Sequence, residues 1–410
     1  MTDVPGPFRN EKALRRLKKR RAADARFRTY GLSAIAFALL ALSLLIVSIG
    51  SQAISAATYH VVRFDVVLDP DVIAPSGENT PDDISRNVDG FYTLLRSDLV
   101  DTFPEVADDR LARQKLGDLV TRLAVLPTAR SVSENPTRIG QATTITVPLN
   151  DDLDLYLKGA ISRDGRMRVG EIDTVSEVGP SEVRLSGPAA FKGLEALIAS
   201  LRAEGVNNLE ARSILLTSGS TTGRLTQIQT DTATVAMLTG SANDFRGARP
   251  TARLIALPEA ERNVSDQQIA WTLALKEMGR ISRVPHFSLL TNTDSTYPEL
   301  AGALAGIVGS LLTMLVTAFI AIPIGIFASI YLEEFAPRNR LTSIIEVNIN
   351  NLAAVPSIVF GLLGAAVFLG FFGLPRSAPL VGGLVLALMT LPTIIIASRA
   401  ALKSVPPSIR

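Results

Sequence analysis

The 410-residue chain contains no cysteine and only two histidines, His60 and His286. No disulfide framework is possible, so an oxidising compartment is neither required nor excluded. A zinc site with so few of these ligands would need an unusual ligand set. The chain also lacks a Gly-x-Ser-x-Gly nucleophile elbow and a Gly-x-x-x-x-Gly-Lys-Ser/Thr phosphate loop. We therefore predict no catalytic residue, no cofactor and no metal, and any ATP hydrolysis must come from another subunit.

The net charge of +2 is small, but the charges are unevenly distributed. Residues 1–28 contain ten lysines and arginines against three acidic residues, and the uncharged window Tyr30–Val62 follows. A basic block beside an apolar span is the positive-inside signal of a cytoplasmic tail. Only one aromatic residue, Phe27, lies between these cations, so we expect no nucleic-acid partner.

Four long apolar runs stand out, and each approaches the roughly 20 residues that a helix needs to cross a bilayer. The first is too long for a cleaved signal peptide and is predicted to be an uncleaved anchor. The four candidate spans are Gly31–Ile54, Ala301–Tyr331, Leu352–Phe372 and Leu380–Ala397.

A cytoplasmic N-terminus puts nearly all basic residues near the spans on the inside, with Arg376 as the exception. This threading gives a basic cytoplasmic tail (1–29), a first transmembrane helix (30–57), an extracytoplasmic domain (58–298) and an incomplete three-helix core (299–410). The fold class is thus an all-α polytopic membrane domain with an inserted α+β domain. The role of the insert stays open between docking a binding protein, stabilising a heterodimer and sensing the envelope.

Within the insert, His60–Leu68 and Thr143–Val147 read as strands, and a capping-box pattern at Ser265–Gln268 predicts a helix after it. The paired acids Asp82-Asp83, Asp108-Asp109 and Asp151-Asp152 are predicted to lie in solvated turns or at helix starts. We expect His60 to be an interfacial residue and Trp271 to be in the core. The segment Ser218–Gly223 is interpreted as a flexible loop, with anion binding as the alternative.

The later three apolar runs contain residues that bend helices or let them approach closely. Gly302 and Gly306 form a GxxxG pair that favours helix packing. Pro323, Pro356 and Pro392 remove backbone hydrogen bonds, and Gly361 loosens packing near the second of these prolines. Broken helices are tolerated in membranes where they are buried in protein or line a cavity, so the pattern indicates a solute pathway.

Polar residues in these runs are few, and four of them are candidates for a substrate pathway or gate. Glu346, Asn348 and Asn351 lead into the third run, and Arg399 lies at the inner end of the fourth. Arg399 either anchors the helix at the interface or acts as a cation that meets an anion or pairs with a carboxylate. Glu333 and Glu334 are predicted to form a solvated cytoplasmic turn.

Three phrases carry a family resemblance: Tyr331-Leu-Glu-Glu-Phe335, Ala354-Val-Pro-Ser-Ile-Val-Phe-Gly361 and the stretch Leu391–Pro406. Together they resemble the PstA permease subunit of bacterial phosphate ABC importers, over residues 299–410 and, by position, the first span. The resemblance implies a multi-pass inner-membrane protein that is not an enzyme. Arg399 takes its pathway or gate role from its place in the third phrase.

The resemblance also implies partners: a second permease (PstC-like), an ATPase dimer (PstB-like) and a periplasmic phosphate-binding protein (PstS-like), besides membrane lipid. In the family the last phrase runs into a Glu-Ala-Ala coupling loop and two further spans. We therefore expect the native protein to continue past Arg410. The alternatives are a permease for another oxyanion, such as sulfate or molybdate, and a membrane-anchored extracytoplasmic sensor.

Overall fold

A computed structural model describes residues 11–75, 80–160, 165–179, 181–203 and 212–406. The chain divides into two compact units, Met1–His286 and Phe287–Arg410. We call the first the sheet unit and the second the helical unit, and describe each by itself.

The sheet unit begins with α1 (Glu11–Ala56), one uninterrupted helix of 46 residues. Its basic and apolar halves join smoothly because Lys, Arg, Ala and Leu are all good helix formers. At 1.5 Å per residue the helix is about 69 Å long, more than twice the roughly 30 Å of a hydrocarbon core. Lys18–Ala56 is a candidate membrane span, and the excess length leaves its basic end outside the lipid.

A three-stranded antiparallel sheet follows α1, in the order β10-β1-β2. Several short helices surround it, and Phe64, Phe91, Phe103 and Trp271 are fully buried in its core. The strand and core predictions for this region are confirmed. The elements are β1 (Thr58–Val67), β2 (Ala142–Pro148), β10 (Ile281–Pro285), α2 (Pro70–Ile73), α3 (Pro81–Arg86), α4 (Val88–Thr102), α5 (Arg110–Gly117), α6 (Leu126–Glu134), α7 (Asp151–Lys158) and α9 (Asp266–Glu277).

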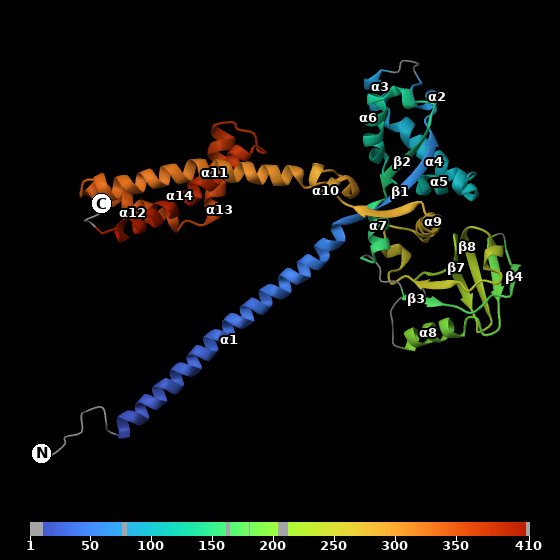
Figure 1. Ribbon diagram of the computed structural model, residues 1–410, viewed down its shortest axis with the longest axis horizontal. Helices are drawn as coiled ribbons and strands as arrows, with labels where there is room; N and C mark the ends of the chain where they lie inside the picture. Colours follow the sequence, from blue (N-terminus) through green and yellow to red (C-terminus); the bar gives the residue numbers. More distant parts are fainter. Residues whose placement is uncertain (1–10, 76–79, 161–164, 180, 204–211, 407–410) are drawn as a thin grey trace. The chain divides into compact units, whose positions relative to one another are not determined.

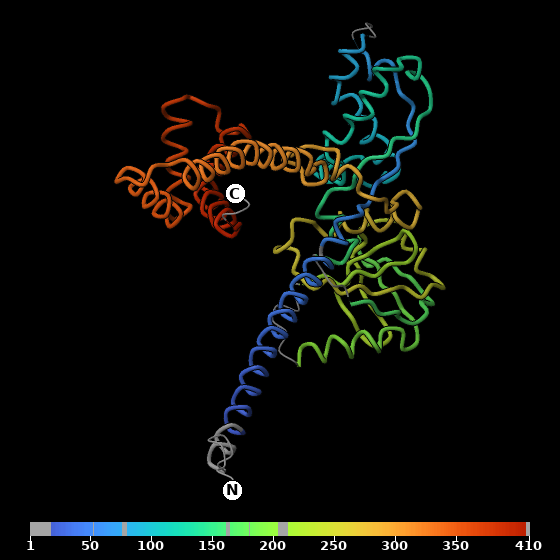
Figure 2. Tube along the Cα trace, turned by 60° about the vertical axis from the view of Figure 1, so that its left-hand side comes forward, coloured from blue at the N-terminus to red at the C-terminus, as the bar shows by residue number. Residues whose placement is uncertain are grey.

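The entrance and the exit of the folded part of this unit lie side by side (Figures 1 and 2). β1 leaves α1 directly and pairs with β10, so that Thr58 lies opposite Pro285. The backbone N–H of His286 donates to the carbonyl of Ala57 at 2.9 Å. The chain therefore enters and leaves the folded part of the sheet unit through two paired strands, β1 and β10.

The sheet unit also contains a seven-stranded antiparallel sheet, in the order β3-β9-β6-β7-β8-β5-β4. α8 (Lys192–Ala203) packs on one face through Leu194 and Ile198, and these two residues, together with Phe191 just before the helix, are buried against Leu185 and Val235. The strands are β3 (Gly165–Arg168), β4 (Thr174–Glu177), β5 (Glu182–Ser186), β6 (Ile214–Ser218), β7 (Thr221–Ile228), β8 (Thr232–Thr239) and β9 (Thr251–Leu254).

Two local predictions for the sheet unit are wrong. Ser218–Gly223 is a tight hairpin between β6 and β7, with Ser218 paired to Thr221 and Gly219 at φ +57°, where only glycine is unstrained. His60 is buried rather than interfacial, because it lies inside the sheet unit on β1. The acid pairs do lie at helix starts, as predicted: Asp82, Asp83, Asp151 and Asp152 are in first turns, and Asp109 caps α5.

The helical unit holds α10 (Ser288–Thr291), α11 (Leu304–Ile330), a π-helical turn (Tyr331–Phe335), α12 (Arg340–Ala353), α13 (Ser357–Gly364), a π-helical segment (Ala365–Phe371) and α14 (Pro379–Ser404). Leu304–Phe335 and Pro379–Ser404 are long and apolar enough to cross a membrane. With α1, the described residues thus contain three such helices, or four if a bent helix pair between them counts as one.

The third predicted span is not one kinked helix. Arg340–Ala353 and Ser357–Phe371 meet at 100°. Pro356 lies between them as the residue that precedes α13, because its missing N–H and its fixed φ suit a helix start. Pro323 and Pro392, in contrast, are inside α11 and α14 as predicted.

α11 and α14 pack against each other in parallel. A Cβ added at Gly382 would meet Thr313, one at Gly383 would meet Val316, and one at Gly325 would meet Ile394. The partner numbers rise together, so the two helices run in the same direction. Two parallel membrane helices require the chain to cross back between them, and Ser357–Phe371 is the segment available for that crossing.

The predicted GxxxG pair has a different environment from these three glycines. Gly302 precedes α11 and packs against the backbone of Asn292, while Gly306 and Gly361 face open space. Neither residue of the pair joins two helices within this unit. The helix packing predicted for this pair is therefore not made among the described residues of this unit.

Candidate functional site

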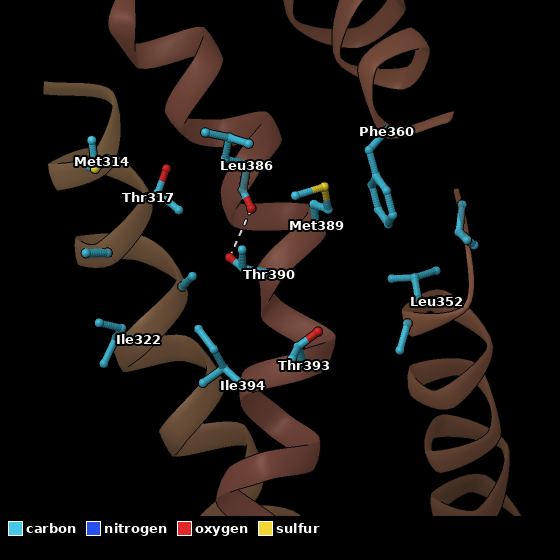
Figure 3. A pocket seen from close by; sticks show the side chains of 14 residues that line it. Met314, Thr317, Ile322, Leu352, Phe360, Leu386, Met389, Thr390, Thr393 and Ile394 are labelled. Carbon is cyan, nitrogen blue, oxygen red and sulfur yellow. Dashed lines mark hydrogen bonds between the residues drawn. The ribbon is translucent and has the colours of Figure 1, made fainter. Parts of the chain in front are cut away.

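A cavity of about 600 Å³ lies among the membrane helices of the helical unit. In Figure 3, α14 runs through the middle, α11 lies on one side, and Leu352 and Phe360 approach from the other. The bend at Pro356 brings the end of α12 and the start of α13 to the same opening. The lining residues are Met314, Thr317, Ala318, Ala321, Ile322, Leu352, Ala353, Val355, Phe360, Leu386, Met389, Thr390, Thr393 and Ile394.

The cavity lining is apolar and carries no charged side chain. Two of its three threonine hydroxyls are already used within their own helices. Thr317 donates to the Thr313 carbonyl at 2.8 Å, and Thr390 donates to the Leu386 carbonyl at 2.9 Å. An oxyanion needs hydrogen-bond donors or cations to replace its water, so these walls alone do not hold one.

Charged residues gather instead around Arg399, six residues or about 1.7 helical turns beyond Thr393 on α14. Its Nη2 lies 2.6 Å from Glu346 Oε1 on α12, and its Nε lies 3.4 Å from Glu333 Oε2 in the π-helical turn. Lys403 Nζ lies 3.7 Å from the same Glu333 oxygen. We call these four residues the Arg399 cluster. It connects the middle of α12 to the C-terminal ends of α11 and α14.

The cluster is partly shielded from solvent, so its ion pairs contribute more to stability than pairs on an exposed surface do. The side chains of Arg399 and Glu333 are 18% and 14% exposed, whereas exposed ion pairs contribute little to stability. The solvated turn predicted for Glu333 is therefore wrong, although Glu334 is exposed. The π-helical turn, a local feature that often occurs at functional sites, carries Glu333 to Arg399.

The other two predicted pathway residues lie elsewhere on α12. The side-chain amide of Asn348 donates to the Ile344 carbonyl at 2.8 Å, and Asn351 is exposed. Within the described ranges no hydrogen bond joins either residue to Arg399. The structure thus brings Glu346 to Arg399, adds Glu333 and Lys403, and leaves the two asparagines apart.

A second buried ionic group lies in the sheet unit. Asp154 accepts from the backbone N–H of His60 at 2.9 Å, contacts His60 Nδ1 at 2.7 Å, and pairs with Lys158 Nζ at 2.6 Å. Burial raises the pKa of Asp154, but the hydrogen bonds from His60 and Lys158 outweigh it and hold that pKa below its ordinary value. The group ties α7 to β1 and has the character of a structural anchor.

Comparison with known proteins gives two separate results. Residues 14–166 match the model of a family described as a domain of unknown function, DUF3333. No solved structure matches.

Curated relatives are ABC transporter permeases. The chain is 29% identical over 125 residues, 30% of its length, to the probable ABC transporter permease protein YqgI of Bacillus subtilis. It is 35% identical over 27% of its length to the phosphate transport system permease protein PstC of Haemophilus influenzae. It is 31% identical over 27% of its length to the phosphate transport system permease protein PstA 1 of Mycobacterium tuberculosis.

These matches cover only part of each partner: 42% of YqgI, 43% of that PstC and 35% of that PstA 1. The chain therefore spans about two fifths of the length of the curated relatives it matches. Over this part, it is a relative of the permease subunits of ABC transporters, among them those of phosphate transport systems.

Proposed function

We propose that the chain is a transmembrane permease subunit of an ATP-driven inorganic phosphate importer, and that it forms the translocation pathway with a second permease. The similarity to phosphate transport permeases carries the proposal. The broken and parallel helices of the helical unit support it, because membrane helices that break and enclose a cavity suit solute pathways. ATP hydrolysis belongs to a separate ATPase subunit.

The proposed site of action is the bacterial inner membrane, with the basic end of α1 in the cytoplasm. α11 and α14 then both run inward, in agreement with their parallel packing, and the Arg399 cluster lies at their cytoplasmic ends. The folded part of the sheet unit becomes an extracytoplasmic α+β domain inserted between the first two membrane helices. A PstS-like binding protein delivers phosphate on that side, and a PstB-like ATPase dimer acts from the other.

The pathway itself requires a second subunit. The cavity walls of the helical unit offer no charge, while large apolar side chains on α11, such as Phe319 (83% exposed) and Phe327 (70% exposed), remain uncovered. A PstC-like permease or lipid covers such surfaces in a membrane. Phosphate then passes between the apolar surface of this helical unit and that of the second permease. It meets cations at the ends of the pathway.

Arg399 is the gate cation in this proposal. In the present conformation two carboxylates neutralise it, so it is not available to an anion. ATP binding draws the ATPases together and reorients α12 against α14, which exchanges the carboxylates for the phosphate at the inner opening. The Arg399 cluster thus closes the inner end until the helices move.

The test is uptake of radiolabelled phosphate by cells that lack the full-length protein and are complemented with variants of it. The wild type restores uptake, and excess sulfate or molybdate does not compete. Arg399→Ala lowers uptake at least about tenfold, because the substitution removes the gate cation and leaves Glu346 without its ion-pair partner. Arg376→Ala, which removes an exposed arginine from the segment before α14, retains wild-type uptake.

Normal phosphate uptake by Arg399→Ala would remove the gate role and leave the permease proposal intact. Absence of rescue by the wild type, or competition by sulfate, would contradict phosphate import. Membrane levels of each variant, measured by immunoblot, separate lost transport from lost protein.

A further inference from the structure

Arginines on the face of the seven-stranded sheet opposite α8 differ in whether carboxylates neutralise them. Ala252 and Leu216 turn toward the α8 core, so their strand neighbours Arg253 and Leu215 turn to the other face. In the register of the sheet, Arg224 of β7, Leu215 of β6, Arg253 of β9 and Arg166 of β3 lie in one row.

At one end of this row the positive charge is balanced. Arg224 Nη1 lies 3.0 Å from Glu259 Oε2 and 3.3 Å from Asp266 Oδ2, and Asp266 is itself buried at the start of α9. This arginine therefore has the carboxylate partners expected of a partly buried cation.

At the other end the positive charge is not balanced. Arg166 and Arg253 lie directly opposite each other on antiparallel strands, an arrangement that destabilises a sheet when both residues carry the same charge. Among the described residues neither forms an ion pair, and the Nε of Arg253 is buried without a hydrogen-bond partner.

A third cation, Lys276 in the last turn of α9, interacts electrostatically with the same pair. Desolvation of the Lys276 amino group, together with the charges of Arg166 and Arg253, lowers the pKa of this lysine, and only the adjacent Glu277 opposes the shift. Three cations from β3, β9 and the last turn of α9 thus interact, and among the residues that the structure describes only Glu277 opposes the effect of this charge on Lys276. We call Arg166, Arg253 and Lys276 the cation triad.

We propose that the cation triad is a binding site for a small inorganic oxyanion of the phosphate class. Two guanidinium groups on adjacent strands present planar N–H donors at the spacing of neighbouring strands, a geometry suited to binding several oxygens of one anion. The ammonium group of Lys276 adds a third donor from another direction. The bound anion offsets the repulsion between the two guanidinium groups.

This site is separate from the transport pathway proposed above, since its residues belong to the sheet unit. Its test uses the purified full chain in lipid nanodiscs, without ATPase or binding protein, and measures thermal unfolding and equilibrium binding of radiolabelled phosphate. Phosphate binds in the millimolar range or tighter and raises the melting temperature, whereas chloride at equal ionic strength does not.

Arg253→Gln and Arg166→Gln each weaken phosphate binding at least about tenfold, the effect expected for loss of a charge-assisted hydrogen bond. Arg249→Gln is the matched control: the same charge is removed from an arginine just before β9 that pairs with Glu171 at 3.2 Å, and phosphate binding is retained. In chloride, Arg166→Gln melts at the wild-type temperature or above, because a like-charge repulsion is gone.

The proposal is overturned if the wild-type chain binds no phosphate, if chloride raises the melting temperature equally, or if both triad variants bind like the wild type. If Arg253→Gln does not fold, the variant Arg166→Gln, which changes an exposed residue, tests the same site. Loss of binding in Arg399→Ala, with binding unchanged in the triad variants, would assign the anion to the helical unit instead.

Discussion

At the scale of single residues, the main finding is that two buried or partly buried ionic groups join residues that are distant in sequence. Arg399 pairs with Glu346 and Glu333, and Asp154 pairs with His60. The sequence indicates Arg399 and Glu346 as two independent candidates for a pathway or gate, because polar residues are rare in the apolar runs. Nothing local indicated that Glu333 would join them, because a Glu-Glu turn between helices is usually solvated.

Asp154→Asn should destabilise the sheet unit. The substitution removes the charge that compensates the buried Lys158, and breaking a buried pair in this way costs about 3–5 kcal/mol. For a unit of this size, at about 2–4 °C per kcal/mol, we expect the melting temperature at pH 7 to fall by about 6–20 °C. Differential scanning fluorimetry of the purified chain measures the change. Asp82→Asn, which removes an exposed partner of Arg86, should shift it by less than about 2 °C.

The same residue gives a pH dependence with a definite sign. The folded-state pKa of Asp154 is lowered, so its ionised form stabilises the fold above its unfolded pKa of about 3.9. That stability is lost as the pH falls through the lower folded value. The difference in melting temperature between wild type and Asp154→Asn should therefore shrink below about pH 4. A difference that stays constant down to pH 2 would contradict the assignment.

At the scale of elements, hydropathy located the membrane helices but not their packing. The two helix prolines Pro323 and Pro392 are tolerated inside α11 and α14, while Pro356 separates two helices that meet at 100°. All three prolines look alike in the sequence. Only Pro356 follows a helix that carries both polar and apolar residues, α12. Such a helix does not need to continue into the lipid, so the chain can turn at Pro356.

Gly383→Ala should destabilise the contact between α11 and α14. The new Cβ would lie 2.5 Å from Val316 Cγ1 and 3.0 Å from the Thr313 carbonyl, so backbone must move. Overpacking of this kind costs about 1–3 kcal/mol. Fluorescence-detected size-exclusion chromatography after heating should show a lower half-denaturation temperature than the wild type.

Gly306→Ala provides the comparison for that experiment, since a Cβ at Gly306 meets nothing within 4 Å in this unit. The purified chain should tolerate it. If Gly306→Ala instead blocks assembly with a second permease while leaving the chain itself stable, the predicted GxxxG contact belongs to that partner.

At the scale of the whole molecule, the absence of cysteine makes the topology directly testable. Single cysteines placed at Asp294 and Arg338 are unique labels in an otherwise thiol-free chain. An impermeant maleimide added to intact spheroplasts should label Asp294→Cys and leave Arg338→Cys unlabelled until the cells are lysed. The reverse pattern would contradict both the threading and the transport proposal.

The sequence alone determined the features that depend on nearby residues. Apolar length set the candidate spans, basic residues beside them indicated the orientation, and the Ser265–Gln268 capping box marked the start of α9. These signals are local, because a helix or a strand is selected by the residues within a few turns of each other. The resemblance to phosphate permeases likewise rested on contiguous phrases.

Only the tertiary structure decided which distant residues meet. It placed Glu333 and Glu346 around Arg399, set Arg166 opposite Arg253, closed Ser218–Gly223 into a hairpin, and made α11 and α14 parallel. Such outcomes follow from strand register and helix packing, which depend on the fit of whole surfaces. No spacing along one stretch of chain encodes them.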